Sequence, residues 1–229
     1  MTALTRYYVA LLLRSHRWIP PVILYAVGVA GLGASKLPYG KGLAPSLSWA
    51  DLMLVPVVAW LTRAVLTAEP PAARSCVAVA AGPRRAQIAA LLAAVLTGAV
   101  IGLAGIAWVL FSAGLERGRY TNKIEIGATF HQVGGGLLAA VICLLVASAI
   151  GALCNPPVVR RPGPGMLTTT AAVLTALVWN VSPANAALRT RHTGVAASSW
   201  PHGVPLLAAM VLLVAGWTVS ALFAARRDS

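Results

Sequence analysis

Five long stretches of this chain contain no charged side chain, and clusters of arginine separate them. The longest, residues 88–111, could cross a bilayer alone, because a membrane-spanning helix needs about 20 predominantly apolar residues. Comparable stretches are 18–35, 132–153, 166–187 and 204–225, and a weaker sixth, 49–67, contains Asp51 and Arg63. A soluble domain of this size cannot bury so many helices that are apolar on every side. The pattern predicts a single all-α integral membrane domain with six spans.

The composition agrees with a membrane protein. The chain is 59% hydrophobic and 10% charged, with a mean hydropathy of +0.80. Its net charge of +13 does not indicate nucleic acid binding, because the basic residues lie in short segments between apolar spans rather than on one face of a soluble helix. Basic segments of this kind are typical of loops beside anionic lipid. The arginine-rich usage favours a bacterial protein, which we place in the cytoplasmic (inner) membrane.

Residues 1–17, before the first span, have the pattern of an amphipathic helix. At 100° per residue one face is apolar and the opposite face is basic. The apolar face contains Leu4, Tyr7, Tyr8, Leu11 and Leu12, and the basic face contains Arg6, Arg14 and Arg17. Such a helix lies in the membrane interface. A cleaved signal peptide ending near Ser35 is the alternative, but the segment before the apolar run is long, so we expect a permanent span.

The distribution of basic residues predicts the orientation in the membrane. With the amino terminus in the cytoplasm, the inner segments are 1–17, 68–87, 154–165 and 226–229. Eleven of the 18 Lys and Arg residues are then on the cytoplasmic side, counting Arg63 at the inner end of the second span. This excess favours the orientation under the positive-inside rule. We therefore expect both termini in the cytoplasm.

The inner segment 68–87 connects the second and third spans and carries the most specific pattern. Pro70 and Pro71 end the second span, because proline lacks the backbone N–H and clashes with the preceding turn. Residues 72–81 suit a short helix, which Gly82 and Pro83 stop. The third span then begins with two arginines, an unfavourable choice at the positive end of a helix dipole. We therefore expect lipid headgroups or a docking partner to stabilise these arginines.

This order of features resembles the permease subunits of ABC-2 type exporters. The shared features are an interfacial helix ending in residues 14–18 before a proline pair, six spans, a glutamate closing the second span, and a short helix with a Gly-Pro-Arg-Arg exit. In that family the short helix docks on a separate cytosolic ATPase. The resemblance implies the following ATPase-docking positions: Glu69, Arg74, Gly82, Pro83, Arg84 and Arg85. It also implies a second permease, identical or homologous, facing the first and fifth spans and placing Gly28 at the interface.

The chain has no recognisable catalytic chemistry of its own. The segment Gly40-Lys41-Gly42 lacks the first glycine of a phosphate-binding loop and its Ser or Thr. ATP and magnesium are therefore expected on the partner, and we expect no catalytic residue, cofactor or metal site in this chain. His131, His192 and His202 share the predicted outer side, but their spacing is not that of a metal site. An ion-coupled carrier is disfavoured because only Asp51 could lie within a span. An accessory or scaffold protein without transport stays an alternative.

Polar and small residues inside the spans suggest a substrate path and packing surfaces. The candidate path residues are Tyr25, Trp60, Thr175, Trp179 and Asn180. Gly98 and Gly102 form a GxxxG step, which we interpret as packing within the chain rather than a dimer seam. The sequence does not identify the substrate.

Overall fold

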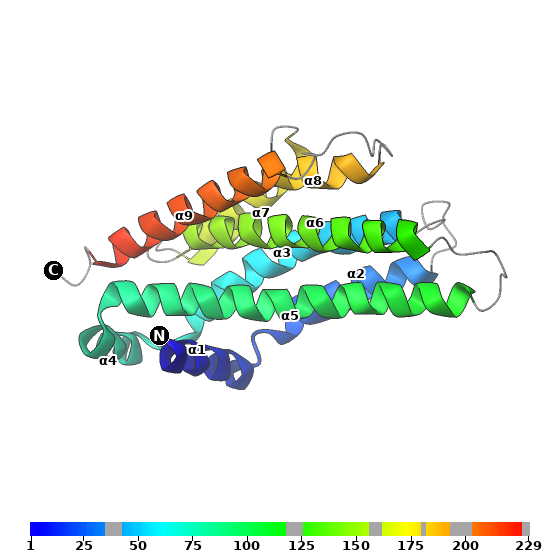
Figure 1. Ribbon diagram of the computed structural model, residues 1–229. Helices are drawn as coiled ribbons and strands as arrows, with labels where there is room; N and C mark the ends of the chain where they lie inside the picture. The colour runs from blue at the N-terminus through cyan, green and yellow to red at the C-terminus, as the bar shows by residue number, and fades with distance from the viewer. Residues whose placement is uncertain (35–42, 118–125, 156–161, 180–181, 193–202, 226–229) are drawn as a thin grey trace.

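The computed structural model describes residues 1–34, 43–117, 126–155, 162–179, 182–192 and 203–225, and all regular secondary structure in them is helical. The helices are α1 (Thr2–Ser15), α2 (Ile19–Ala34), α3 (Leu43–Ala68), α4 (Pro71–Ala81), α5 (Pro83–Arg117), α6 (Ile126–Leu153), α7 (Pro162–Val178), α8 (Pro183–His192) and α9 (Gly203–Ala225). Figure 1 shows α2, α3, α5, α6 and α9 running lengthwise along one bundle. The amino terminus, α4 and the end of α9 lie at one end of this bundle, which we call the α4 end.

Among the described residues, four helical segments are long and apolar enough to cross a membrane: Pro45–Ala68, Pro83–Ser112, Gln132–Leu153 and Gly203–Ala225. They correspond to four of the expected spans. Ile19–Gly31 and Gly165–Val178, within the other two, are apolar but shorter. The chain is therefore a helical multi-pass membrane protein.

The expected span 166–187 is not one continuous helix. Helix α7 ends at Val178 and α8 begins at Pro183. Proline disfavours helical geometry at the residue before it and cannot donate a backbone hydrogen bond, so the helix is interrupted here. The Asn185 side chain donates a hydrogen bond to the carbonyl of Leu177, which satisfies one of the free acceptors at the end of α7.

Helix α3 lies at the centre of the bundle, although it is the least apolar of the expected spans. It packs against α1, α2, α5, α6, α7 and α8. In its apolar window 67% of the residues are buried, against 22% for α9. Polar side chains on α3 therefore face other helices instead of lipid. For example, the Arg63 guanidinium donates to the side-chain oxygen of Asn155, just after α6, at 2.9 Å.

Glycines allow several helices to approach closely. A Cβ atom at Gly98 would lie 2.9 Å from Leu144 and Val58, and one at Gly102 would lie 3.2 Å from Leu54. This confirms that the GxxxG step packs within the chain. Gly28 also packs within the chain, since its carbonyl accepts a hydrogen bond from Trp49 and a Cβ there would meet Met53 at 3.3 Å. Gly28 is half-buried against α3, and its expected place at a permease interface stays a prediction.

Candidate docking site at the α3–α4 junction

The connection between α3 and α5 folds as its prolines and glycine predict. Pro70 precedes α4 and Pro71 occupies its first turn, where a missing N–H costs little. At the other end Gly82 has φ of 84°, a conformation that favours glycine, and its N–H donates to the Ala78 carbonyl. Helix α5 starts at once with Pro83. The expected short helix at 72–81 is confirmed, and both of its ends are fixed by residues with restricted or special backbone geometry.

Glu69 lies at the bend between α3 and α4 and is buried, with 6% of its surface exposed. The Tyr8 hydroxyl donates to its Oε2 at 3.1 Å, and the Tyr7 hydroxyl donates to its Oε1 at 3.3 Å. The Arg74 Nε lies 4.0 Å from Oε2. We call Tyr7, Tyr8, Glu69 and Arg74 the Glu69 cluster. It joins the amino-terminal helix to the two helices that meet at the bend.

The chemistry of the Glu69 cluster is that of a carboxylate with neutral phenol donors. Burial, followed by the negative charge of Glu69, raises the pKa of both Tyr7 and Tyr8 above the ordinary value of 10.0. Both phenols are therefore protonated at neutral pH and can donate hydrogen bonds. Bonds from neutral donors to a buried carboxylate are among the stronger ones in proteins.

Two arginines satisfy the carbonyl groups at the end of α3. Arg74 donates to the Leu66 carbonyl, and Arg17 donates to the Thr67 carbonyl at 2.7 Å. The last four carbonyls of a helix lack intrahelical partners, and the negative end of the helix dipole attracts cations. Arg17 thus joins the segment between α1 and α2 to the last turn of α3, next to the Glu69 cluster.

Helix α1 packs on the bundle with its predicted apolar face. Tyr8 and Leu12 are buried and belong to a core cluster with Leu61 and Val65 of α3 and Leu91 of α5. The exposed basic residues of the segment are Arg6, Arg14 and Arg17. His16, in the left-handed conformation with φ of 54°, ends the helix and lets the chain turn into α2.

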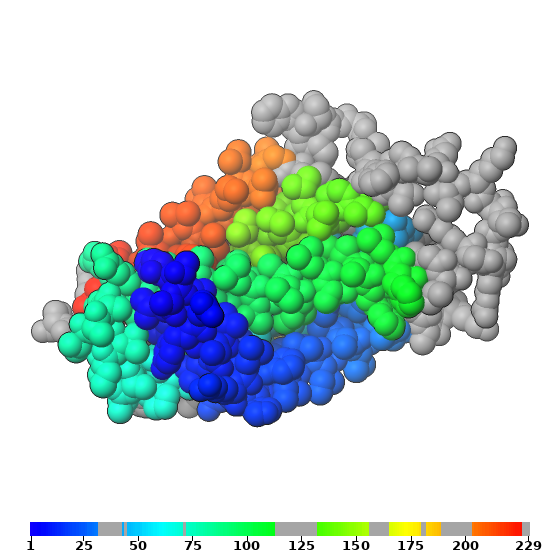
Figure 2. Space-filling view, turned by 60° about the horizontal axis from the view of Figure 1, so that its bottom comes forward, coloured from blue at the N-terminus to red at the C-terminus, as the bar shows by residue number. Residues whose placement is uncertain are grey.

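The outer face of α4 is exposed and built from small residues. It consists of Ala72, Ser75, Cys76, Val79 and Ala80, and Val79 is 89% exposed. These positions follow the i, i+3, i+4, i+7, i+8 spacing of one helical face. Arg84 and Arg85, at the start of α5, are also exposed. Figure 2 shows α4, in teal, and α1, in dark blue, beside each other on one face of the molecule.

Two further polar contacts tie helices together near the α4 end. The Gln87 amide in α5 donates to the Ser220 hydroxyl in α9 at 2.9 Å. Asn155, fully buried, accepts from Arg63 and donates to the Gly151 carbonyl at 2.8 Å. These contacts join α5 with α9 and α3 with the end of α6, while the Glu69 cluster joins α1 with α3.

The structure separates the expected docking residues into three pairs. Glu69 and Arg74 hold the bend from inside, Gly82 and Pro83 form the tight link, and Arg84 and Arg85 face outward. Sequence reasoning missed the role of Tyr7 and Tyr8, since their contact with Glu69 spans 61 or 62 residues along the chain. The one feature of the sequence that could have indicated this contact is the pair of adjacent tyrosines on the apolar face of α1.

The expected substrate-path residues that the structure describes lie on α2, on α3 and at the end of α7. Tyr25 lies between α2 and α5, Trp60 is partly exposed on α3, and the Thr175 hydroxyl donates to the carbonyl of Ala171 in its own helix. Trp179 is exposed after the end of α7. Among the side chains described, no hydrogen bond or ring contact joins these residues. Asn180 lies outside the described residues, so its expected place is not observed.

No protein-family model, curated protein or solved structure matches this chain. Within the described residues, no group of three or more His, Cys, Asp or Glu side chains could hold a metal ion. The side chains of His131, His192 and His202 lie outside the described part.

Proposed function

We propose that this chain is the permease subunit of an ABC-2 type exporter in a bacterial cytoplasmic membrane. Six spans, formed by α2, α3, α5, α6, α7 with α8, and α9, would line a path together with a second permease. Both termini would be cytoplasmic. A separate cytosolic ATPase, with its ATP and magnesium, would dock on α4.

The observation that carries the proposal is the outer face of α4. Ala72, Cys76 and Val79 expose apolar surface on a short helix at the end of the bundle, while its base is held by Glu69 and Arg74. An exposed apolar face costs free energy in water unless a partner covers it. Small side chains also let another protein approach closely. Figure 1 shows α4 at this end of the bundle, beside the start of α5, and we expect a cleft in a soluble partner to cover its outer face there.

Arg84 and Arg85 define the electrostatic character that we expect of the partner. Both occupy the first turn of α5, where a cation is unfavourable by roughly 0.3–1 kcal/mol at low ionic strength. An acidic surface on the ATPase would offset that cost. Glu69 and Arg74, by contrast, are positioning residues in this proposal: they orient α4 and do not themselves contact the partner.

The contacts around α4 suggest how movement would be transmitted. Helix α4 packs on α5 and is linked to α3 by the bend, and the Glu69 cluster adds α1. A displacement of α4 by nucleotide-driven movement of the ATPase would therefore reach the central helix α3 directly. Arg63 and Gln87 would pass it on to α6 and α9.

The test is co-purification of the permease from membranes of its native host. Wild-type protein should capture a nucleotide-hydrolysing subunit with measurable ATPase activity. The variant V79D combined with R84A and R85A should lose at least about tenfold of that bound activity, since removing each interface side chain costs on the order of 1 kcal/mol. The matched control R6A with R14A removes two exposed arginines from α1 and should retain it. Equal activity in both variants, or no ATPase captured by wild type, would support the scaffold alternative.

Ion-coupled transport is a second candidate, favoured by one observation. Asp51 of α3 is 1% exposed, and a carboxylate buried in a spanning helix is a functional candidate by default. Under this alternative D51N would abolish gradient-dependent uptake or efflux, while V79D would have no effect. Under the exporter proposal V79D would abolish transport, while D51N would have no effect.

A further inference from the structure

Two arginines and a histidine are exposed where α1 turns into α2. Arg14 lies in the last turn of α1, His16 ends the helix in the left-handed conformation, and Arg17 follows it. We call these three residues the junction cluster. The ion pair of Arg74 with Glu69 does not include them, and no carboxylate of a described residue lies within ion-pair distance of either arginine. The described part of the chain therefore leaves the charge of the junction cluster without a counter-ion.

Backbone carbonyls orient two side chains of the junction cluster. The Arg17 Nη1 donates to the Thr67 carbonyl at 2.7 Å, and the His16 Nδ1 donates to the Arg14 carbonyl at 2.9 Å. A guanidinium has five N–H donors in a planar fork, and Arg17 uses Nη1 alone in its bonds to described residues. Its Nη2 and Nε donors stay available for an outside acceptor. Phosphate oxygens match this fork, because they accept two parallel N–H bonds from it.

The junction cluster lies at the depth where two spanning segments end. Arg17 bonds to the carbonyl of Thr67, and the spanning segment of α3 ends at the next residue. The apolar segment of α2 begins at Ile19, just after the junction cluster. Trp18, between them, donates its indole N–H to the Leu13 carbonyl at 3.2 Å, and tryptophan is enriched at the level of lipid headgroups. The junction cluster is therefore at headgroup level.

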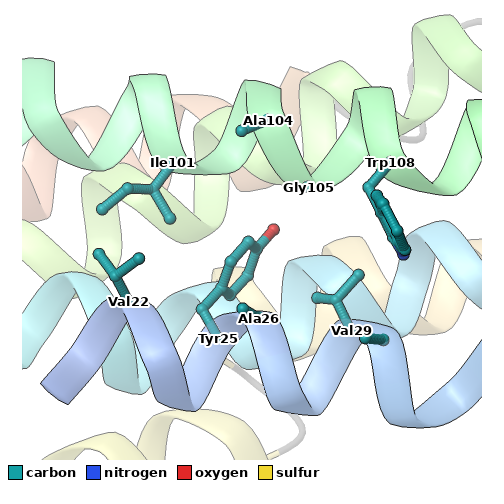
Figure 3. A pocket seen from close by; sticks show the side chains of 9 residues that line it. Val22, Tyr25, Ala26, Val29, Ile101, Ala104, Gly105 and Trp108 are labelled. Carbon is teal, nitrogen blue, oxygen red and sulfur yellow. The ribbon is translucent and has the colours of Figure 1, made fainter. Parts of the chain in front are cut away.

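The surface next to the junction cluster is apolar where it enters the bilayer. Leu13 of α1 and Ile23 of α2 are both exposed. A groove of about 290 Å³ between α2 and α5 starts beside Val22 (Figure 3), and all its lining side chains are apolar or aromatic. Because α2 and α5 span the membrane in the proposed topology, acyl chains of the surrounding lipid cover this groove. Basic groups above an apolar surface match a phospholipid better than a soluble anion.

We propose that the junction cluster binds the phosphate of an anionic phospholipid, with Arg14 and Arg17 donating hydrogen bonds to its oxygens. The Thr67 carbonyl holds Arg17 in position, so the bound lipid is joined through this side chain to the last turn of α3. Only the folded chain brings Arg17 to Thr67, and a ligand that binds only the folded state stabilises it. Anionic lipid should therefore hold α1, α2 and α3 together at the α4 end. This inference does not depend on transport or on an ATPase.

Diffuse attraction of the membrane to every exposed arginine is the alternative. Arg6 of α1, and Arg84 and Arg85 of α5, are exposed as well, but no bond to a described residue orients their side chains. Arg6 lies about 12 Å from Arg14 along the helix axis, so it is not part of the junction cluster. R6Q is therefore a matched control for R14Q, since each removes one exposed arginine from the same helix.

The experiment measures thermal unfolding of the full-length protein in a neutral detergent, followed by tryptophan fluorescence, with lipid added at rising mole fractions. Saturating phosphatidylglycerol should raise the midpoint by roughly 5–10 °C, the effect of a ligand at a hundredfold its Kd. Phosphatidylcholine has a phosphate without net charge and should raise it much less. R14Q should need about tenfold more phosphatidylglycerol for half of the effect, since a bond to a charged group is lost. R6Q should behave like wild type.

Two further variants test the geometry of the junction cluster. R17Q should also need about tenfold more phosphatidylglycerol. Each variant is compared with its own midpoint without lipid, because Arg17 also satisfies a carbonyl at the end of α3. R14K keeps the charge but lacks the planar fork, so it should recover only part of the affinity that R14Q loses.

Three outcomes would overturn the proposal. Equal losses in R6Q and R14Q would show diffuse attraction between the membrane and the basic residues. A rise of the midpoint with inorganic phosphate equal to that with phosphatidylglycerol would show a site for a soluble anion. Equal rises with phosphatidylglycerol and phosphatidylcholine in wild type would show that annular lipid of any charge is sufficient.

Discussion

The two halves of the bundle are held together by different means. At the α4 end, polar side chains from different helices bond across the structure, as Glu69 does with Tyr8 and Arg63 does with Asn155. Towards the other end, α5 packs through Gly102 and Gly105, and a groove separates part of α2 from it. The first half is joined by several polar side chains, while in the second α5 packs through glycines and Trp49 of α3 donates to the Gly28 carbonyl of α2.

This difference has a mechanical meaning. Directional hydrogen bonds between buried groups resist rearrangement, because each broken bond leaves an unsatisfied polar group. Apolar surfaces slide more readily, since a side chain that moves away from one apolar neighbour packs against another or against lipid. We therefore interpret the α4 end as the part that receives a force and the opposite half as the part that changes shape.

The largest effect is expected from removing the centre of the Glu69 cluster. E69A leaves the buried Tyr8 hydroxyl without an acceptor and removes the partner of Arg74, and should cost roughly 2 kcal/mol. Thermal unfolding should then occur roughly 4–8 °C lower. A thiol-reactive dye can follow it through the fully buried Cys143 in a background that carries C76S and C154S. Tyr7 is more exposed, so Y7F should lower the midpoint less. An unchanged midpoint in E69A would show that the cluster contributes no rigidity.

Two glycine substitutions compare the halves directly. A Cβ at Gly151 would lie 2.6 Å from Thr62, which is fully buried, and one at Gly105 would overlap the Tyr25 hydroxyl. Thr62 is β-branched and bonded to the Val58 carbonyl, so it cannot move aside, whereas Tyr25 borders the groove.

We therefore expect G151A to destabilise by about 2–3 kcal/mol and G105A by about 1 kcal/mol, within the usual cost of overpacking. The control G134A has nothing within 4 Å of its added Cβ and should be neutral or slightly stabilising. Denaturant midpoints of the three variants decide the order. A larger loss for G105A than for G151A would reverse our assignment of the rigid and the adaptable half.

The smallest expected effect is a loss of folding stability at alkaline pH. The folded protein raises the pKa of Tyr8 above the ordinary value of 10.0, through burial and then Glu69. Below pH 10 the phenol is protonated in both states, and the stabilisation is fully present. As pH rises above 10 the unfolded chain releases this proton first, so the stability falls. Unfolding midpoints measured between pH 9 and 11 should fall less steeply in Y8F than in wild type. Parallel slopes would mean that Tyr8 is not held as a neutral donor.

Local patterns in the sequence predicted the elements of the α4 end closely. Pro70 and Pro71 before the short helix, and Gly82 with Pro83 after it, act within a few residues, and α4 indeed runs from Pro71 to Ala81. The apolar face of residues 1–17 likewise predicted which side of α1 is buried. Ser182 with Pro183 is a comparable local signal for a helix start, and it would have predicted the break between α7 and α8.

The central position of α3 and the Glu69 cluster could not be predicted in the same way. Hydropathy rates a span by its affinity for lipid, so it ranks α3 low because of residues such as Arg63, which bonds to Asn155 just after α6. The bonds of Tyr7 and Tyr8 to Glu69 depend on how α1 lies against α3, a long-range arrangement that no short pattern contains.

The most direct test of the docking account uses the native Cys76, an exposed thiol on the outer face of α4. In inside-out membrane vesicles of the native host, a membrane-impermeant maleimide should label Cys76 slowly. After high salt has stripped peripheral proteins, the labelling rate should rise at least about tenfold, since a docked partner covers this face and the Arg84 and Arg85 contacts are screened by salt. A cysteine-directed crosslinker should join Cys76 to a nucleotide-hydrolysing protein before stripping. Rapid labelling that stripping does not change, or labelling only in right-side-out vesicles, would contradict the account.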